Sequence, residues 1–242
     1  DRSATVHAFD YENKTTETLT INSLLMYSDT TDESGYGMRF GMSYDPNKFW
    51  ITGMAYYRFD DDLNINDMGY QTRNNLSNFR TFTMYTENDF LTTSKILERT
   101  YKFAFSKNAD THGLQLSQNI NLSFKQSFKD TSGFEIKVAH KSSGNNDLLT
   151  RGSALAPFVK FGQGGNFSLM YYGKQDARWS YWMYLSRDRQ SLQSFTTTSN
   201  NIALGGYYYP SDNIKFGIHL GKYNTKNWLN WLEDNRLGTY PL

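Results

Sequence analysis

Cysteine is absent from this chain of 242 residues. Disulfide frameworks, cysteine-based metal sites and thiol catalysis are therefore excluded. No run approaches the roughly 20 apolar residues of a membrane-spanning helix, which excludes the helical membrane proteins. The chain also lacks a strong net charge, because its 25 basic and 24 acidic residues nearly cancel. That balance argues against nucleic acid as a partner.

Apolar and polar side chains alternate over residues 113–129. This period of two is typical of a strand with one apolar and one polar face. At the even-numbered positions, which are otherwise mostly apolar, only Gln118 and Gln126 interrupt the pattern. The apolar positions are Leu114, Leu116, Ile120, Leu122, Phe124 and Phe128.

The length of this stretch predicts a strand that crosses a membrane. About 15 residues at roughly 3.3 Å each reach near 50 Å, far longer than an ordinary strand of a soluble protein. A strand tilted by about 45° through a hydrocarbon layer of about 30 Å needs such a length. We therefore expect the wall of a transmembrane β-barrel, with its apolar side toward lipid and its polar side toward the lumen. A long strand of a soluble sandwich or solenoid is the alternative.

Further alternating stretches, separated by turns, extend the pattern along the chain. They predict one all-β domain over residues 1–242, an antiparallel up-and-down transmembrane barrel of about twelve visible strands. Aromatic residues form 17% of the chain, as the interfacial girdles of such barrels require. Residues 157–174 are expected to form one strand with a bulge at 162–165, with two strands around a turn as the alternative. The expected strands are 3–11, 17–28, 37–44, 49–59, 78–86, 95–106, 113–129, 134–141, 157–174, 179–185, 201–209 and 214–221.

The end of the chain bears on whether this barrel is complete. A membrane-spanning sheet cannot keep an open edge, because each unpaired backbone N–H or C=O in hydrocarbon costs several kcal/mol. Outer-membrane barrels usually finish on a strand with a terminal aromatic residue, whereas this chain ends on Pro241 and Leu242. We therefore expect part of a longer protein, closed by further sequence or by another chain. Pairing of Val6, His7 and Ala8 with residues 215–220 would mean a complete barrel instead.

An acidic stretch at residues 60–67 is the best candidate for bound chemistry. Asp62, Asn64 and Asn66 place oxygen ligands at alternate positions, as at the start of a calcium loop. The later positions differ from a calcium loop. Asp67 stands where such a loop has its sharp-turn glycine, and Arg73 stands where it has its bidentate glutamate. We therefore favour a solvated loop, with calcium as the alternative. The candidate metal ligands are Asp60, Asp62, Asn64, Asn66 and Asp67.

No catalytic residue is predicted. A hydrolase needs a histidine beside a serine or an aspartate, whereas the four histidines lie on separate strands or turns. His140 has the same alternation as the apolar residues of its strand, whereas His219 falls between them. The two side chains are expected on opposite faces, so no shared site is expected.

Several basic residues near strand ends allow two roles. They could line an anion-attracting lumen or end strands in the lipid headgroup layer, and we favour the second role. They are Arg151, Lys174, Arg178, Arg187 and Arg189.

Three stretches resemble one family: residues 59–76, with Asn66-Asp67-Met68-Gly69-Tyr70 and Arg73-Asn74-Asn75, then Leu149-Thr150-Arg151-Gly152, and finally residues 228–240. They are similar to the C-terminal barrel of a large uncharacterised bacterial family. In that family a carbohydrate-binding module of the family-nine type precedes the barrel, which is a domain of unknown function. The resemblance implies a fold and a location, but no reaction and no cofactor.

The expected function follows from the barrel. We expect a transport or channel component of the bacterial outer membrane, with glycans as candidate solutes. The alternative is a structural or docking barrel that anchors a surface or periplasmic domain or a partner protein. An outer-membrane hydrolase has the least support. The expected partners are the lipid bilayer and lipopolysaccharide.

Overall fold

The computed structural model describes residues 4–31, 33–65, 74–147, 158–173, 178–192, 195–211, 213–233 and 236–240. All regular elements in these residues are strands. No helix among them has the length and apolar character to span a membrane. The candidate loop residues Asn66 and Asp67 lie outside the described ranges.

Thirteen strands form one sheet, and two form a second. The strands are β1 Ala4–Lys14, β2 Leu19–Thr30, β3 Ser34–Asn47, β4 Trp50–Phe59, β5 Leu76–Glu87, β6 Ile96–Ala109, β7 Asn119–Phe128, β8 Gly133–Lys141, β9 Gly144–Asn146, β10 Val159–Tyr172, β11 Trp179–Leu192, β12 Thr196–Ser211, β13 Ile214–Lys226, β14 Trp228–Glu233 and β15 Arg236–Tyr240.

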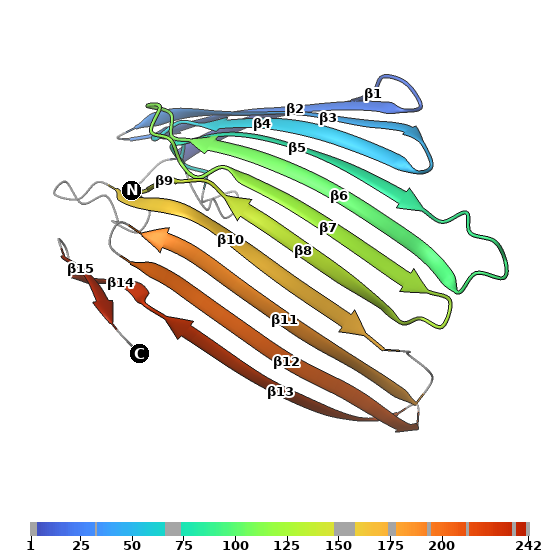
Figure 1. The fold of residues 1–242 in the computed structure, drawn as a ribbon. Helices are drawn as coiled ribbons and strands as arrows, with labels where there is room; N and C mark the ends of the chain where they lie inside the picture. Colours follow the sequence, from blue (N-terminus) through green and yellow to red (C-terminus); the bar gives the residue numbers. More distant parts are fainter. Residues whose placement is uncertain are drawn as a thin grey trace. The chain divides into compact units, whose positions relative to one another are not determined.

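Successive strands are hydrogen-bonded neighbours from β1 to β13, with only the three-residue β9 off this path, paired to β10. Figure 1 shows this order as a continuous change of colour across the strands. The prediction of an all-β, antiparallel, up-and-down arrangement is confirmed. Twelve strands lie on the path, as the sequence predicted, and β14 pairs with β15 in the separate sheet.

The sheet is not closed within the described residues. Val6 pairs with Ser28 of β2, and β13 pairs only with β12. The pairing of Val6, His7 and Ala8 with residues 215–220 is therefore not formed.

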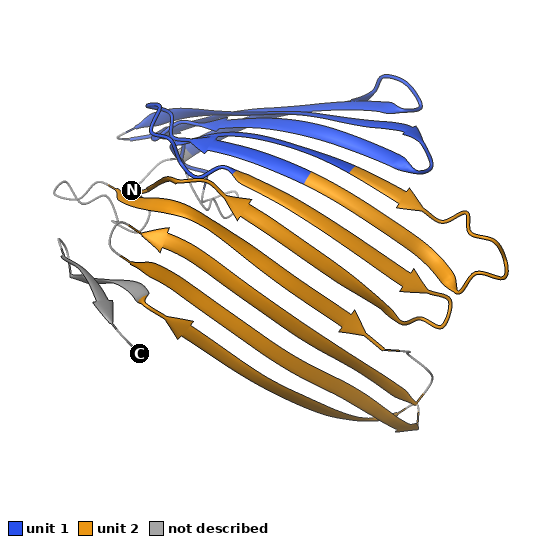
Figure 2. Ribbon diagram, viewed as in Figure 1, with its two compact units in different colours: residues 1–83, 104–118 blue, residues 84–103, 119–242 orange. Residues whose placement is uncertain are grey.

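The chain divides into two compact units, Asp1–Thr83 with Ala104–Gln118 and Met84–Phe103 with Asn119–Leu242. Figure 2 colours unit 1 blue and unit 2 orange. Strands β5 and β6 contribute residues to both units.

The long strand predicted for residues 113–129 is shorter than expected. Only Asn119–Phe128 forms β7. The preceding residues turn back instead, because Gly113 has a φ of 90° and the Leu116 N–H donates to the Asn108 carbonyl of β6 over 3.1 Å. Leu116 is 8% exposed. Its apolar parity therefore reflects packing within unit 1 rather than a lipid-facing position.

Other boundaries differ where the alternation fades. Strand β10 is a single strand with a register shift between Phe161 and Gly164, which confirms the predicted bulge. Strands β12 and β13 extend beyond the predicted 201–209 and 214–221. Most of their added residues are polar on both faces, so a two-residue period could not reveal them.

Candidate functional site

Unit 2 gathers its apolar side chains on one face of the sheet. Met183 pairs with Leu204, which pairs with Leu220, so the three form one row across β11, β12 and β13. The neighbouring rows continue the face on both sides. Exposed members of the face include Leu122, Val138, Phe167, Tyr181, Ile202, Phe216 and Ile218.

Unit 1 has a similar apolar face. Phe9, Leu25 and Met38 form one row across β1, β2 and β3. Their exposed fractions are 62%, 54% and 38%. Phe40, Tyr44, Trp50 and Met54 on the same face are also exposed.

Few apolar side chains are fully buried. Among the described residues, only Leu63 and Leu116 are buried hydrophobic side chains. A soluble domain instead hides most large aliphatic and aromatic residues in a core and rarely exposes contiguous apolar patches larger than a few hundred Å². The apolar faces of the two units are therefore more exposed than is usual for a soluble domain.

Aromatic rings occupy the ends of these apolar faces. In unit 2, Trp179 stacks on Tyr208 with ring centroids 4.3 Å apart. In unit 1, Tyr27 lies between His7 and Tyr36, at centroid distances of 6.4 Å and 4.9 Å. Tyr36 and Tyr44 lie near opposite ends of the same strand, β3.

The spacing of these aromatic positions can be compared with the apolar band of outer-membrane barrels. From Tyr36 to Tyr44 is about 26 Å along the strand, at roughly 3.3 Å per residue. A tilt of about 40° reduces this to about 20 Å of thickness, close to the apolar band of about 25 Å in outer-membrane barrels.

The opposite face of unit 2 is polar and contains a pocket of about 390 Å³. Asp188 lies between Arg187 and Arg189, which are on the apolar face, so its side chain points to this polar face. The Ser199 and Thr225 hydroxyls lie 3.0 Å apart beside it. The pocket lining combines Asp188, Gln190, Ser199, Asn201, Thr225 and Tyr223 with Phe161 and other residues. Carboxylate, amide, hydroxyl and aromatic groups together suit a polar, hydroxyl-rich solute.

Aromatic residues also pack over glycines on this polar face. A Cβ at Gly205 would lie 2.8 Å from both Trp182 Cε2 and His219 Nδ1. Lys215 Nζ lies 3.7 Å from the Tyr207 ring centroid, and that ring contacts His219 edge-on at 5.2 Å. This cluster joins side chains of β11, β12 and β13 at one end of these strands.

The polar face of unit 1 carries two arginines around one ring. Arg39 and Arg80 place their guanidinium carbons 5.6 Å and 4.5 Å from the Tyr57 centroid. Tyr57 Oη is the one buried side-chain polar atom without a hydrogen-bond partner among the described residues. The two cations give this part of the face a positive field.

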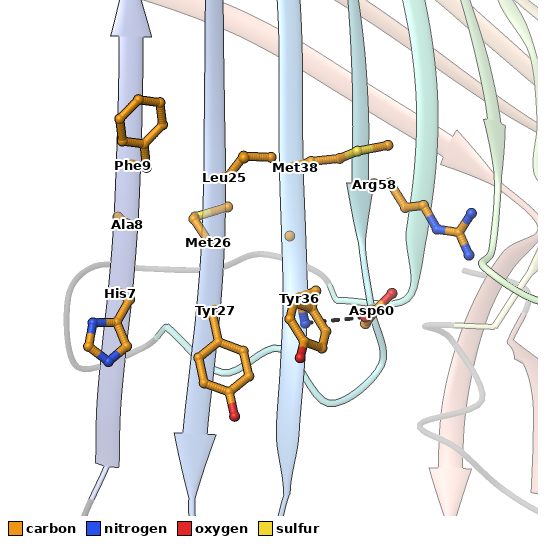
Figure 3. A pocket seen from close by; sticks show the side chains of 11 residues that line it. His7, Ala8, Phe9, Leu25, Met26, Tyr27, Tyr36, Met38, Arg58 and Asp60 are labelled. Atoms are coloured by element: carbon orange, nitrogen blue, oxygen red, sulfur yellow. Dashed lines mark hydrogen bonds between the residues drawn. The ribbon is translucent and has the colours of Figure 1, made fainter.

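A second pocket, of about 630 Å³, lies on the apolar side of unit 1. Figure 3 shows His7, Tyr27 and Tyr36 in one row. The Tyr36 backbone N–H donates to Asp60 Oδ2 over 3.2 Å, drawn as a dashed line in the figure. Phe9, Leu25, Met38 and Arg58 are among the other lining residues.

The predicted acidic loop begins directly after β4 and docks on the polar face of unit 1. Leu63 is 1% exposed, and its backbone lies so close to Gly35 that a Cβ there would clash. The Asn64 N–H donates to the Ser28 hydroxyl over 2.9 Å, and Ser28 is fully buried. Leu63 therefore packs the loop start onto unit 1, while Asp62 and Asn64 stay exposed.

The carboxylates of this loop are partly engaged by the chain itself. Asp61 Oδ1 accepts from the Thr111 hydroxyl at 2.7 Å, and Asp61 Oδ2 lies 3.6 Å from His112 Nδ1. The Asn75 side chain accepts from the Thr111 N–H at 2.8 Å. These contacts tie the loop after β4 to the turn after β6.

The calcium site stays a prediction. Asp60, Asp62 and Asn64 lie close in sequence at the loop start, whereas Asn66 and Asp67 fall outside the described residues. Within the described part of the chain, no group of three or more His, Asp or Glu side chains could hold a metal. Asp62 and Asn64 are exposed.

The basic residues and histidines considered in the sequence lie on different faces of the sheet. Arg187 and Arg189 pair with Phe167 and Gly165 of β10, and so belong to the apolar face of unit 2 rather than to its polar face. His140 lies on that apolar face and His219 on the polar face. Arg178 is described and exposed, whereas Arg151 and Lys174 lie outside the described residues.

Sequence reasoning missed the partner of Gln126, which interrupts the apolar parity of β7. Its side-chain oxygen accepts from Arg99 Nε at 2.9 Å, and Arg99 also approaches Glu87 at 3.7 Å. Gln126 thus provides a hydrogen-bond acceptor for the Arg99 guanidinium on the neighbouring strand, β6.

Comparison with known proteins gives one result. The model of a family described as Domain of unknown function (DUF5916) matches residues 1–239. No curated protein and no solved structure matches the chain.

Proposed function

We propose that this chain, which belongs to the family described as Domain of unknown function (DUF5916), forms the wall of a β-barrel in the bacterial outer membrane. In this proposal the apolar faces of both units contact lipid, and the polar faces line the lumen. The barrel is a transport or channel component for polar solutes, with glycans as the candidate class.

One observation carries the membrane proposal. Large apolar side chains such as Phe216, Ile218 and Leu220 are 61%, 62% and 56% exposed on a single sheet face. At about 25 cal/mol per Å² of apolar surface, leaving a whole face of such residues in water is strongly unfavourable. A lipid environment removes that cost, and the aromatic ends of the faces suit the two interfaces.

The polar pocket supports the transport proposal. Asp188, Gln190 and Asn201 offer hydrogen-bonding groups on a face that would be inaccessible to lipid. Tyr223 and Phe161 add ring surfaces on which a sugar ring could stack. This combination suits the passage or transient binding of a hydroxylated solute.

A second function is favoured by the loop after β4. Leu63 packs this segment onto the polar face of unit 1, so part of a lumen would be filled. A filled lumen suits a structural barrel that anchors a surface or periplasmic domain.

Planar-bilayer recording of the full-length protein separates the two functions. A transport barrel gives discrete conductance steps, and these steps shrink when oligosaccharides enter the lumen. If the inserted protein shows no conductance at any voltage, the transport function is contradicted and the anchoring function is favoured. A detergent-independent soluble monomer would contradict both functions, because neither tolerates an apolar face in water.

A further inference from the structure

Four cations lie together on the apolar face of unit 2, at the end where β11 leads into β12. Arg187 and Arg189 stand two residues apart on β11 and so share a face. Lys222 and Lys226 stand on β13, on that same face. All four side chains are exposed.

The strand register places these cations close to one another. Arg189 pairs with Thr198, and Thr198 pairs with Lys226. Two strand spacings of about 4.8 Å therefore separate the backbones of Arg189 and Lys226 by roughly 10 Å. Lys222 shares a row with Leu185 and Ile202, at the edge of the apolar rows. The cations thus adjoin the apolar surface directly.

No carboxylate balances this charge on the same face. In the described parts of β7, β8 and β10–β13, Asp and Glu do not occur at positions of the apolar-face parity. Asp188 separates the two arginines in sequence but lines the pocket of the opposite face. Within the described residues, none of the four cations forms an ion pair.

We propose that Arg187, Arg189, Lys222 and Lys226 bind the phosphate groups of an anionic glycolipid headgroup while its acyl chains cover the adjoining apolar rows. The proposal rests on the proposed membrane barrel and names its lipid-binding site. Charge and surface agree on such an amphipathic partner: arginine bonds phosphate through a planar fork of donors, and lysine adds a point charge. The neighbouring Ile202, Leu204 and Leu220 are 52%, 48% and 56% exposed and offer a surface for the acyl chains.

The test measures lipid retained by the full-length protein in detergent, using native mass spectrometry. The probes are a diphosphorylated lipid A, the same lipid without phosphates, and inorganic phosphate as competitor. The variant replaces all four cations, as Arg187→Gln, Arg189→Gln, Lys222→Gln and Lys226→Gln. The matched control removes four cations from the polar face of unit 2, as Lys125→Gln, Lys137→Gln, Lys141→Gln and Lys215→Gln.

We expect the wild type and the control to retain the diphosphorylated lipid in preference to the dephosphorylated one. The variant should lose about tenfold or more of that affinity, since each basic residue near a lipid surface contributes appreciably to anionic lipid binding. Equal retention by the variant overturns the proposal. Equal competition by inorganic phosphate at matched concentration also overturns it, since acyl chains would then add nothing.

The same samples separate this proposal from the proposed function. Reconstitution into vesicles and protease protection report whether the protein enters a membrane. Insertion with unchanged lipid retention in the variant defeats only the lipid site. Failure to insert defeats the barrel itself.

Discussion

Leu63 Cδ2 lies 2.7 Å from the position that a Cβ of residue 37 would occupy. The loop after β4 therefore docks where β3 presents a glycine, and Leu63 fills the space above the polar face of unit 1. A Cβ at Gly37 would also meet Met26 and Phe59 at 3.0 Å and 3.1 Å. The contact holds the start of the loop against β3, and the hydrogen bond from the Asn64 N–H to the Ser28 hydroxyl holds it against β2.

Leu63→Ala is expected to lower the free energy of unfolding by about 2–4 kcal/mol, because it leaves a cavity at a nearly fully buried site. The measurement is reversible denaturant unfolding of the full-length protein in lipid or detergent. Leu91→Ala is the control, because Leu91 is 80% exposed. Equal effects of the two substitutions would contradict the docking of the loop.

Leu204 and Ala203 are neighbours in β12 that face opposite sides. If the apolar face of unit 2 contacts lipid, Leu204→Lys should destabilise the protein in bilayers by about 2–4 kcal/mol, the cost of a lysine near the bilayer midplane on a lipid-facing strand. Ala203→Lys, on the polar face, should cost much less. Unfolding in bilayers measures both values. A larger cost for Ala203→Lys would place lipid on the other face.

Gly205 provides a test of the aromatic cluster on the polar face of unit 2. Gly205→Val should destabilise the protein by about 1–3 kcal/mol, because the new side chain overpacks against Trp182 and His219. Gly221→Val is the matched control, since the nearest atom to its Cβ position lies at 3.7 Å, an ordinary contact. Thermal unfolding of the two variants, followed by circular dichroism, compares the two. An equal loss at Gly221 would mean that the cluster is not the cause.

Asp61→Ala should loosen the link between the loop after β4 and the turn after β6. The expected cost is about 0.5–1 kcal/mol, because the Thr111 hydroxyl loses a charged acceptor but keeps Asn75 Oδ1 at 2.7 Å. Asp62→Ala serves as control, since the Asp62 side chain is exposed. Unfolding in calcium and in chelator tests the predicted calcium site in parallel. A calcium-dependent stabilisation that disappears in Asp62→Ala would establish that site.

Alternation along single strands was enough to predict the two faces. Met183, Leu204 and Leu220 each belong to an apolar parity within their own segment, and antiparallel pairing then joins them into one row. The all-β class, the strand order and the bulge in β10 follow from the same local signal together with turn residues.

What the sequence could not predict depends on contacts between distant segments. Leu116 continues the alternation of β7, yet its N–H donates to Asn108 and its side chain is buried. Local periodicity cannot distinguish such a return from a strand. The packing of Trp182 over Gly205 joins two strands, and nothing in either segment alone indicates that contact. The cationic site likewise appears only once the register brings Lys226 near Arg189.

Asp188 offers a test of the lumen that does not depend on stability. If the polar face of unit 2 lines a conducting pore, Asp188→Lys replaces a negative with a positive charge beside the permeating ions and lowers the cation-to-anion permeability ratio. Arg187→Glu is the matched control, because Arg187 is adjacent in sequence but belongs to the apolar face. Reversal potentials in a salt gradient across a planar bilayer measure the ratio. We expect a shift for Asp188→Lys and a smaller one for Arg187→Glu. A shift confined to Arg187→Glu would mean that the assigned lumen face is the lipid face.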